Sequence, residues 1–491
     1  MVFYSAGVDV GGSSVKAWVV GDDYNVVGRA AVSTPVLKNS AHRNEFLPNH
    51  LWRAVISALS MAIAKAGPAA LNIEGVTVTS LRQGFVLIGD QIELGNGVYN
   101  SDRRGAAQLE LLKNKIGAER LYEVTGHWSA PELTLPKLMH IAHTEPERWA
   151  ETRRVLFVHD WVVWRLTGVM RSEVSQISAG QMADVEQRDW AKDIINELGL
   201  GMERFAPSVE PGVRVGEVTA AASRSIPVLK IGTPVVSGGG DTQFAALGMG
   251  GLQSGAVTIV AGSSTPIQVA TSMPIRDPQR RPWVSTHMLP TLWAAEFNAG
   301  YPGTMAAWLA GVVGDRSIDD RRRSSPGANG VTALVSTPHW AEQYWAWKAP
   351  NAIIGVTPST TPGDLADAML ESHAFGIRGN LEDLASTSQG LPARVLLGGG
   401  AAHALGTILP DALNRPIDLV AEPMPAALAG AFLVGRALGE DPPLPDPEFR
   451  TLQPTESGRY ERSYSRYLSE YSALHAAITP SAPDPSPEVE K

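Results

Sequence analysis

The sequence contains no cysteine among its 491 residues. Disulfide bonds, thiolate catalysis and cysteine-ligated metals are therefore excluded. The sequence also shows no apolar stretch as long as a membrane helix and no basic, apolar leader segment at its N-terminus. These absences predict a cytoplasmic protein with no membrane partner.

An excess of positive charge is lacking as well. The formal net charge is −9, which disfavours general affinity for nucleic acids or anionic membranes. The one dense basic run is Arg321-Arg322-Arg323, and the acidic residues just before it largely cancel its charge. We therefore predict a solvated loop there and no nucleic-acid partner.

The composition is that of a globular α/β enzyme. Apolar residues make up 44% of the chain, and 48 glycines and 35 prolines punctuate many short elements. A chain of this length exceeds what one hydrophobic core usually serves. We expect two or three structural units.

The most informative motif is Gly238-Gly239-Gly240-Asp241. It follows an apolar, strand-like run at 234–236 and precedes a helix-like run at 242–247. Glycines let a ligand approach the backbone, and a helix N-terminus favours an anion. The motif predicts that Asp241 is a base near a phosphate.

Two further segments resemble each other. Residues 8–20 and 257–269 are each two strand-like runs joined by a Gly-Ser-Ser turn. Such turns are often ordinary, because glycine and serine favour turns for conformational reasons. Their recurrence nevertheless suggests two domains that grip one polyphosphate, with Asp9 placed to hold Mg²⁺.

Polar residues follow other strand-like segments. The strand expected at 73–79 leads to Arg82 and Gln83, at a strand exit where open α/β folds place ligand contacts. A solvated strand exit would explain the two residues equally well. Asp102 precedes a helical segment, so helix capping alone would explain it. A carboxylate beside Arg104 also suits a polyhydroxylated ligand. Both interpretations of Asp102 stay open at this point.

Neither of two histidines in the middle of the chain is assigned to a metal. His140 and His159 stand among apolar residues without a second metal-ligand spacing, so a structural role is expected for both. His159 opens a helix that Gly168 ends. Near the end of the chain, a strand at 394–397 precedes Gly398-Gly399-Gly400 and a helical run at 401–413, an order that suits the adenosine part of a nucleotide.

In this order the motifs resemble the FGGY carbohydrate kinase family, over roughly residues 4–475. The resemblance implies an α/β fold of two ribonuclease-H-like domains, shared with actin and heat-shock protein 70, with a cleft between them. The implied divisions are 1–243 for the sugar side, 244–440 for the nucleotide side, and 441–491 for a C-terminal helix and a disordered tail. Tyrosines at helical spacing in 456–478 are expected to pack on the body of the protein.

The resemblance also implies the site. Asp241 corresponds to the catalytic base, and Asp9 and Asp241 to the Mg²⁺ ligands. The implied sugar contacts are Arg82, Gln83, Asn100, Asp102, Arg104 and Asp241. The implied ATP contacts are Gly11, Gly12, Ser13, Ser14, Lys16, Gly262, Ser263, Ser264, Gly398, Gly399 and Gly400.

Three positions depart from the family pattern. Gly12 stands where the family often has Thr, His140 where it often has Trp, and Asn100 where Trp commonly precedes the Asp-x-Arg of Asp102 and Arg104. The first weakens one phosphate contact and the last alters the sugar pocket. Lys137-Leu138 and Glu371 are among the supporting matches.

The implied activity is ATP- and Mg²⁺-dependent phosphorylation of a primary hydroxyl on a small sugar, ketose or polyol. Residues 80–87 and 100–102 look most like the autoinducer-2 kinases of the family, which act on a linear five-carbon ketone. Xylulokinase- or glycerol kinase-like activity is the alternative, and a homodimer is the assembly we allow for. A non-catalytic sugar sensor and a nucleotide-driven chaperone or filament protein are readings of a different class.

Overall fold

The computed structural model describes residues 3–38, 43–251, 255–313, 326–342, 351–387, 390, 392 and 394–478. The basic run at 321–323 and the tail from 480 onward, for which we predicted a solvated loop and disorder, lie outside these residues. Contacts divide the chain into two compact units. The first unit comprises residues 1–258, 268–296 and 420–448, and the second 259–267, 297–419 and 449–491. The domain limits expected at 243 and 440 stay predictions.

Up to residue 251 the elements are β1 (Tyr4–Val10), β2 (Ser14–Gly21), β3 (Val26–Ser33), β4 (Leu37–Lys38), β5 (Asn44–Phe46), α1 (Pro48–Ala66), η1 (Gly67–Asn72), β6 (Ile73–Ser80), β7 (Phe85–Ile88), β8 (Gly97–Val98), η2 (Arg104–Gln108), α2 (Leu109–Ile116), α3 (Ala118–Thr125), α4 (Thr134–Thr144), α5 (Pro146–Glu151), β9 (Arg154–Phe157), α6 (Val158–Thr167), β10 (Ser172–Glu173), α7 (Val174–Ala179), β11 (Ala183–Asp184), β12 (Asp189–Trp190), α8 (Lys192–Glu197), η3 (Met202–Arg204), β13 (Ser208–Val209), β14 (Arg214–Glu217), α9 (Ala220–Ser225), β15 (Pro234–Gly240) and α10 (Asp241–Gly248). The remaining described elements are β16 (Ala256–Val260), β17 (Pro266–Thr271), β18 (Trp283–Thr286), β19 (Trp293–Asn298), α11 (Pro302–Val313), η5 (Ala328–Gly330), β20 (Thr332–Leu334), β21 (Ala352–Ile354), α12 (Pro362–Ser386), β22 (Arg394–Gly398), α13 (Ala402–Gly406), α14 (Leu409–Leu413), β23 (Ile417–Val420), α15 (Pro425–Ala437), β24 (Phe449–Leu452) and α16 (Glu461–Ile478).

The first unit is built on a six-stranded sheet in the order β14-β15-β6-β1-β2-β3. Its three central strands are parallel: β1 pairs with β6, and β6 with β15. In this register Val10, Ser80 and Gly240 are level with one another, since both Val10 and Gly240 pair with Ser80. The carboxyl ends of these three strands therefore meet at one edge of the sheet, where α/β folds place ligands.

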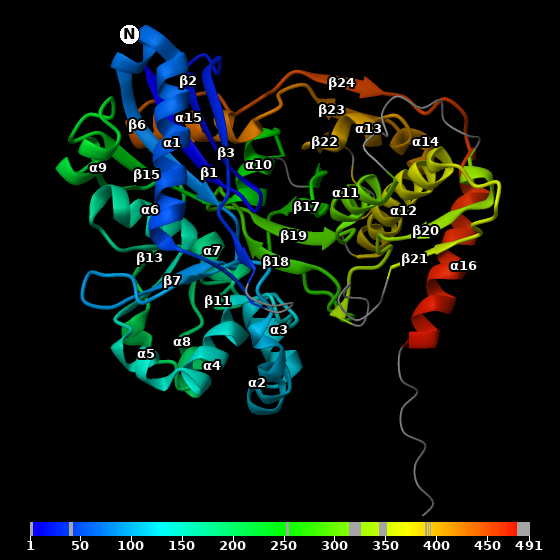
Figure 1. The fold of residues 1–491 in the computed structure, drawn as a ribbon, viewed down its shortest axis with the longest axis horizontal. Coiled ribbons are helices and arrows are strands. Elements are labelled where there is room, and N and C mark those ends of the chain that lie inside the picture. The colour runs from blue at the N-terminus through cyan, green and yellow to red at the C-terminus, as the bar shows by residue number, and fades with distance from the viewer. Residues whose placement is uncertain are drawn as a thin grey trace, which may run out of the picture. The chain divides into compact units, whose positions relative to one another are not determined.

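Helices cover both faces of this sheet. Alternate side chains of a strand point to opposite faces, so one strand contributes to the core on both sides. Along β2, Val15, Ala17 and Val19 join the core cluster that contains α1, whereas Trp18 and Val20 join the cluster that contains α15. Figure 1 shows α1 in blue alongside β3. The sheet is thus buried on both faces, and its edge is left for polar residues.

One helical stretch departs from the sequence-based expectation about membrane length. Residues Pro48–Asn72, which comprise α1 and η1, are long and apolar enough to pass for a membrane span by length and composition. The buried side chains of α1 pack into the sheet core of the first unit. Core packing therefore explains the apolar character of this stretch.

The second unit contains β22, β23 and β24 as neighbouring strands and the 25-residue helix α12. The helix at α16 packs as predicted: Tyr460, Tyr464, Tyr467 and Tyr471 are each at most 8% exposed. Three of these rings lie within 6.0 Å of the ring of Phe375 in α12.

The helical run expected at 401–413 is wrong in detail, because it is split into α13 and α14. Pro410 stands at the start of α14, where its missing N–H costs no hydrogen bond. The break lies at residues 407–408. Proline in the first turn thus marks a new helix within what sequence periodicity suggested was one.

Candidate functional site

Three of the predicted residues lie at the shared strand edge of the first unit. Asp9 is the next-to-last residue of β1, Arg82 follows the end of β6, and Asp241 opens α10 directly after β15. Arg82 Nε lies 4.0 Å from Asp241 Oδ1. The sheet register therefore brings residues from three distant parts of the sequence to one edge.

The two carboxylates influence each other electrostatically. Burial raises the pKa of Asp9 to about 7, and the nearby charge of Asp241 adds to that rise, whereas Lys16 opposes it. Burial also raises the pKa of Asp241, and Arg82 lowers it. The Asp241 side chain is 34% exposed, so it can reach a ligand although its environment penalises charge.

The carboxylate pair fits a divalent cation. Asp9 Oδ1 is buried and has no hydrogen-bond partner among the described residues. The described residues contain no cluster of three or more metal-ligating side chains. One or two carboxylates are nonetheless what Mg²⁺ uses when substrate phosphates and waters complete its shell. The predicted Mg²⁺ ligands are thus chemically suitable.

Arg82 is fixed by a buried carboxylate that the sequence did not reveal. Its two terminal nitrogens lie 2.6 and 3.0 Å from the carboxylate oxygens of Glu296. Glu296 is 2% exposed and also accepts a hydrogen bond from Gln268 Nε2 at 2.8 Å. This bidentate ion pair holds the guanidinium in one orientation and leaves its Nε towards Asp241.

Two hydroxyl groups anchor the first glycine-serine loop. Tyr99 donates a hydrogen bond to the carbonyl oxygens of Gly11 and Gly12, at 3.0 and 2.7 Å. Thr34 Oγ1 donates to Gly11 O at 2.9 Å. Lys16 lies beyond the loop on β2, is exposed, and pairs with Asp9 in the β1–β2 register.

A buried lysine holds the two loops that carry Gln83 and Asn100. Lys137 Nζ donates to the carbonyl oxygens of Tyr99, Asn100 and Gln83 at 2.9, 3.1 and 3.2 Å. Burial lowers the pKa of Lys137 to about 7. Gln83 itself has φ +65, so its backbone is in a region that non-glycine residues rarely occupy. The hydrogen bond from Lys137 to Gln83 O stabilises this conformation.

Asp102 and Arg104 form a closed ion-pair network. Asp102 is fully buried, and its carboxylate accepts from the backbone N–H groups of Arg104 and Asn44 as well as from the Arg104 guanidinium. Arg104 also donates to Glu45 at 2.7 Å. Asp102 therefore has a structural role in a buried ion pair, but the expected helix cap is wrong, because Arg103 occupies the cap position of η2 and makes no side-chain cap bond. Sugar binding by Asp102 stays a prediction.

The second unit brings the second glycine-serine loop and the triple glycine together. Ala261 N donates to Gly398 O at 2.8 Å, and Ala401 N donates to Ala261 O at 3.0 Å. A Cβ added at Gly399 would lie 2.5 Å from Ala261 O. The two motifs assigned to the nucleotide, which are separated by about 135 positions in the sequence, are therefore neighbours.

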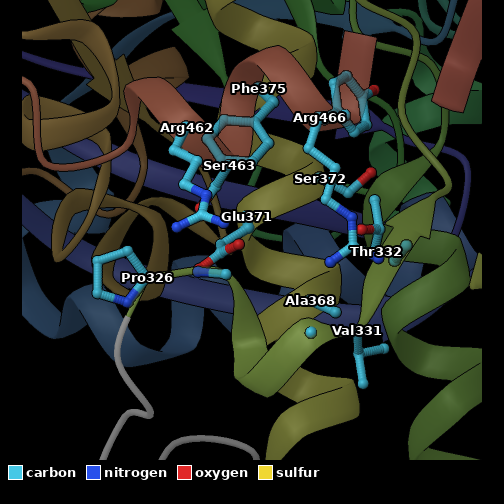
Figure 2. A pocket seen from close by; sticks show the side chains of 14 residues that line it. Pro326, Val331, Thr332, Ala368, Glu371, Ser372, Phe375, Arg462, Ser463 and Arg466 are labelled. Carbon is cyan, nitrogen blue, oxygen red and sulfur yellow. The ribbon is translucent and has the colours of Figure 1, made fainter. Parts of the chain in front are cut away.

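A separate cavity of about 250 Å³ lies in the second unit between α12 and α16. Figure 2 shows Glu371, from α12, and Arg462, from α16, among the residues that line it. Burial raises the pKa of Glu371 to about 7, although its carboxylate accepts the N–H of Gly327. None of the site residues predicted from the sequence lines this cavity.

Glu296, Tyr99 and Thr34 were missed by sequence reasoning. Glu296 lies within a largely apolar strand, and a buried acidic residue usually has a cationic partner. That signal could have flagged Glu296, but it could not have named Arg82, which is 214 positions away. The hydroxyl groups of Tyr99 and Thr34 have no comparable signal.

Comparisons with known proteins agree with this geometry. Residues 4–248 match the N-terminal domain, and residues 257–438 the C-terminal domain, of the FGGY family of carbohydrate kinases. An autoinducer-2 kinase of Escherichia coli (strain K12) is 25% identical over 505 residues, which cover 95% of each chain. An autoinducer-2 kinase of Enterobacter sp. (strain 638) is 28% identical over 461 residues, which cover 89% of this chain and 86% of the relative.

Solved structures share the fold. A xyloylose kinase from Brucella ovis has a TM-score of 0.84 at 25% identity and covers 96% of this chain and 100% of its own. A glycerol kinase from Plasmodium falciparum with ADP has a TM-score of 0.80 at 15% identity, with coverages of 98% and 99%. The predicted α/β fold of two ribonuclease-H-like domains is confirmed.

Proposed function

We propose a mechanism and a substrate class on the premise that this chain belongs to the FGGY family of carbohydrate kinases. The protein is therefore a carbohydrate kinase, an enzyme that transfers a phosphoryl group to an alcohol. In our proposal the acceptor is a primary hydroxyl of a small ketose or polyol, the donor is ATP with Mg²⁺, and Asp241 is the general base. The observation that carries this proposal is the edge where Asp9, Arg82 and Asp241 converge.

Asp241 has one carboxylate oxygen available for a substrate proton. Oδ1 accepts from the backbone N–H of Thr242 at 2.8 Å and from its hydroxyl at 3.2 Å. No hydrogen bond to Oδ2 is found among the described residues, and the side chain is partly exposed. We assign to Oδ2 the proton of the attacking hydroxyl, because a base must lie within hydrogen-bond reach of that proton.

Arg82 favours the ionised form of this base. Burial disfavours the charged form of Asp241, and the guanidinium of Arg82 counteracts that by lowering the pKa of the carboxyl. Because Glu296 engages both terminal nitrogens of Arg82, the guanidinium cannot swing into a stronger ion pair with Asp241. Such a pair would hold the carboxylate away from the substrate. Glu296 therefore controls, through Arg82, how strongly Asp241 is engaged in an ion pair.

Asp9 and Asp241 would hold Mg²⁺. When bound, the ion supplies positive charge that offsets the charge on the transferred phosphoryl group. The backbone N–H groups of the loops at residues 11–14 and 262–264 and at Gly398-Gly399-Gly400 are suited to bind and orient the nucleotide. In a phosphoryl transfer with a loose transition state, such positioning and electrostatic stabilisation provide most of the rate enhancement.

For the substrate, we propose a linear five-carbon ketone of the autoinducer-2 precursor type. Support comes from the relatives of that name, whose identity of 25–28% extends over 86–95% of their length. A cyclic or open pentulose is the second candidate, because the solved xyloylose kinase is 25% identical over its whole chain. We also propose that the protein is cytoplasmic and forms a homodimer. Size-exclusion chromatography would measure the assembly.

The test is ADP release with Mg-ATP across ketoses, polyols and the linear ketone, with a control that lacks sugar. We expect turnover to require one sugar class, and Asp241→Asn to lower kcat by about 10²- to 10⁴-fold, the range of general-base catalysis. ATP binding should persist in that variant. Turnover of Asp241→Asn close to that of the wild type would disprove the assigned base.

If no sugar is phosphorylated, two alternative functions remain to be distinguished. ADP release without sugar would identify an ATPase of the same fold. Sugar binding by calorimetry without ADP release would identify a sensor. Glu74→Gln is a matched control, because it removes an exposed carboxylate from β6 without touching the strand edge.

A further inference from the structure

A buried polar network lies behind the end of β15, on the side of α7. Its members come from α6, β10 and α7 and are each at most 1% exposed. They are His159, Asp160, Glu173, Ser175 and Gln176. Buried polar side chains are costly unless they are hydrogen-bonded, and the bonds here converge on the strand that ends beside Asp241.

Ser175 contacts the backbone immediately before the proposed base. The N–H of Gly240 donates to Ser175 Oγ at 2.9 Å. A backbone N–H can only donate, so the serine oxygen is the acceptor in this bond. The hydroxyl hydrogen is then directed to Glu173 Oε2, which lies 2.5 Å from Ser175 Oγ. The orientation of the hydroxyl is therefore fixed by chemistry at both ends.

Glu173 is in turn held by the start of α7. Its Oε1 accepts the N–H of Ser175 at 2.9 Å, and its Oε2 accepts the N–H of Gln176 at 3.0 Å. Burial raises the pKa of Glu173 to about 7, and the three hydrogen bonds that the carboxylate receives, counting that from the Ser175 hydroxyl, oppose this rise. The acceptor for Ser175 is thus rigid.

A second connection holds the residue on the other side of Gly239. Gly238 N–H donates to His159 Nε2 at 3.2 Å, and His159 Nδ1 lies 2.8 Å from Asp160 Oδ1. Because Nε2 accepts, the ring proton is on Nδ1 and is donated to Asp160. Asp160 also accepts the N–H of Glu173 at 3.1 Å. Both bonds therefore lead back to the same network.

The network packs closely against β15 at Gly239. Its φ is +151, and an added Cβ would lie 2.7 Å from Ser175 Oγ and 3.0 Å from Glu173 Oε2. A side chain at this position would displace the network. The same helix start also reaches β6, because Gln176 Nε2 lies 3.1 Å from Ser80 Oγ, two residues before Arg82.

We propose that Ser175, oriented by Glu173, is a positioning residue for Asp241 and thereby sets the rate of phosphoryl transfer. This inference rests on the proposed function, in which Asp241 is the general base. The chain that transmits the position is Glu173, Ser175, the Gly240 N–H and Asp241. A misplacement of about 1 Å at a reacting group can cost 10²-fold in rate, so loss of one bond beside the base should appear in kcat.

The test compares Ser175→Ala with Ser178→Ala. Ser178 is on the same helix and equally buried, and its hydroxyl has no hydrogen-bond partner among the described residues. We expect Ser175→Ala to lower kcat by about 10- to 100-fold, with the KM values for sugar and Mg-ATP within about twofold of the wild type. Ser178→Ala should retain wild-type kcat, and its Tm should fall less than that of Ser175→Ala, because it loses no hydrogen bond.

Glu173→Gln provides a second variant that preserves side-chain shape. Its amide has one acceptor oxygen in place of two, so it cannot accept from both the Ser175 N–H and the Ser175 hydroxyl. A smaller loss in kcat is therefore expected, with the same unchanged KM values. Hydrogen exchange of the peptide containing Gly240 gives a readout independent of turnover. Exchange at that amide should accelerate in Ser175→Ala and Glu173→Gln and not in Ser178→Ala.

The outcomes separate the two hypotheses. If Asp241→Asn is inactive and Ser175→Ala matches Ser178→Ala in kcat, the positioning role is overturned and the general base stands. If Asp241→Asn turns over like the wild type, the proposed base fails, and the positioning role falls with it whatever the exchange result. If Ser175→Ala does not fold, Glu173→Gln alone decides, and wild-type kcat in that variant overturns the inference.

Discussion

The two glycine-serine loops have similar sequences but are stabilised in different ways. In each loop a glycine N–H donates to the carbonyl oxygen of the last serine. Gly11 N donates to Ser14 O and Gly262 N to Ser264 O, both at 3.1 Å. Around the first loop, side-chain hydroxyls of Tyr99 and Thr34 bind the carbonyl groups. Around the second, the partners are mainly backbone atoms, and the one side-chain hydroxyl among the described residues is that of Thr304, which donates to Ser263 O at 3.4 Å.

The second loop is confined by close approach. A Cβ added at Gly303, in the first turn of α11, would lie 2.0 Å from Gly262 O. The N–H of Thr304 donates to Ser263 O at 3.2 Å. Only hydrogen atoms at Gly303 permit this packing, whereas a Cβ at Gly12 in the first loop would meet no atom within 4 Å.

The loops also differ in charge. Three positions before the glycine of the Gly-Ser-Ser turn, the first loop has Asp9 and the second has Ile259. The carboxylates and the perturbed pKa values that we assign to chemistry thus belong to the first unit, whereas the second loop offers mainly backbone donors. Similar turn sequences therefore indicate a similar turn, and their surroundings determine which loop also has a carboxylate beside it.

The largest effect on this comparison is expected from Gly303→Ala. The added methyl group cannot coexist with Gly262 O, so either the loop or the start of α11 must move. We expect a loss of about 1–3 kcal/mol in stability, as for overpacking, and a rise in the KM for Mg-ATP. Thermal unfolding and steady-state kinetics would measure both.

Gly311→Ala is the matched control for that variant. It lies in the same helix with no atom within 4 Å of the added Cβ, and alanine favours a helix over glycine by up to about 1 kcal/mol. Its stability should be equal to or higher than that of the wild type. Equal behaviour of the two variants would contradict the packing argument for the second loop.

A pH-dependent effect of intermediate size is expected from Asp9→Asn in metal-free protein. Burial and the charge of Asp241 raise the pKa of Asp9 from 3.8 to about 7. The folded state therefore binds a proton more tightly than the unfolded state, and this contribution to stability is lost as pH rises towards 7. Asparagine cannot ionise, so the Tm of the variant relative to the wild type should rise between pH 4 and 7, by several degrees at most.

Asp277→Asn should show the opposite sign. Hydrogen bonds from Arg281 outweigh burial and lower the pKa of Asp277, so its ionised form stabilises the fold above pH 4 and this stabilisation disappears in acid. The variant should be less stable than the wild type at neutral pH. A pH-independent difference between Asp9→Asn and the wild type would refute the charge contrast between the loops.

The smallest effect is expected from Tyr99→Phe. The change removes the donor to Gly11 O and Gly12 O, a loss of about 1 kcal/mol for a typical hydrogen bond. We expect a rise of about two- to fivefold in the KM for Mg-ATP, since 1 kcal/mol is about a factor of five in binding. Tyr122→Phe is the control, because its hydroxyl donates to Pro282 O away from the loop. The same KM in both variants would show that Tyr99 does not support the loop.

Local patterns predicted individual elements well. The strand expected at 73–79 is β6, the helix expected to end at Gly168 does so with that glycine at φ +73, and Asp241 opens a helix after a glycine-rich strand. Apolar alternation, helix-terminating glycines and strand-glycine-helix order are local signals. The split between α13 and α14 was missed because an apolar periodicity can continue across two consecutive helices.

The sequence by itself determined the chemistry that could occur: no thiols, two carboxylates at strand ends, and glycine-rich turns suited to phosphate. Only the tertiary structure decided the partners. Arg82 pairs with Glu296, Asp102 closes a buried network with Arg104, and Ser175 supports Gly240. The physical reason is that strand register and helix packing bring these atoms within hydrogen-bond distance. The partners are separated by 2 to 214 positions in the sequence, and local sequence patterns do not predict pairs that are far apart.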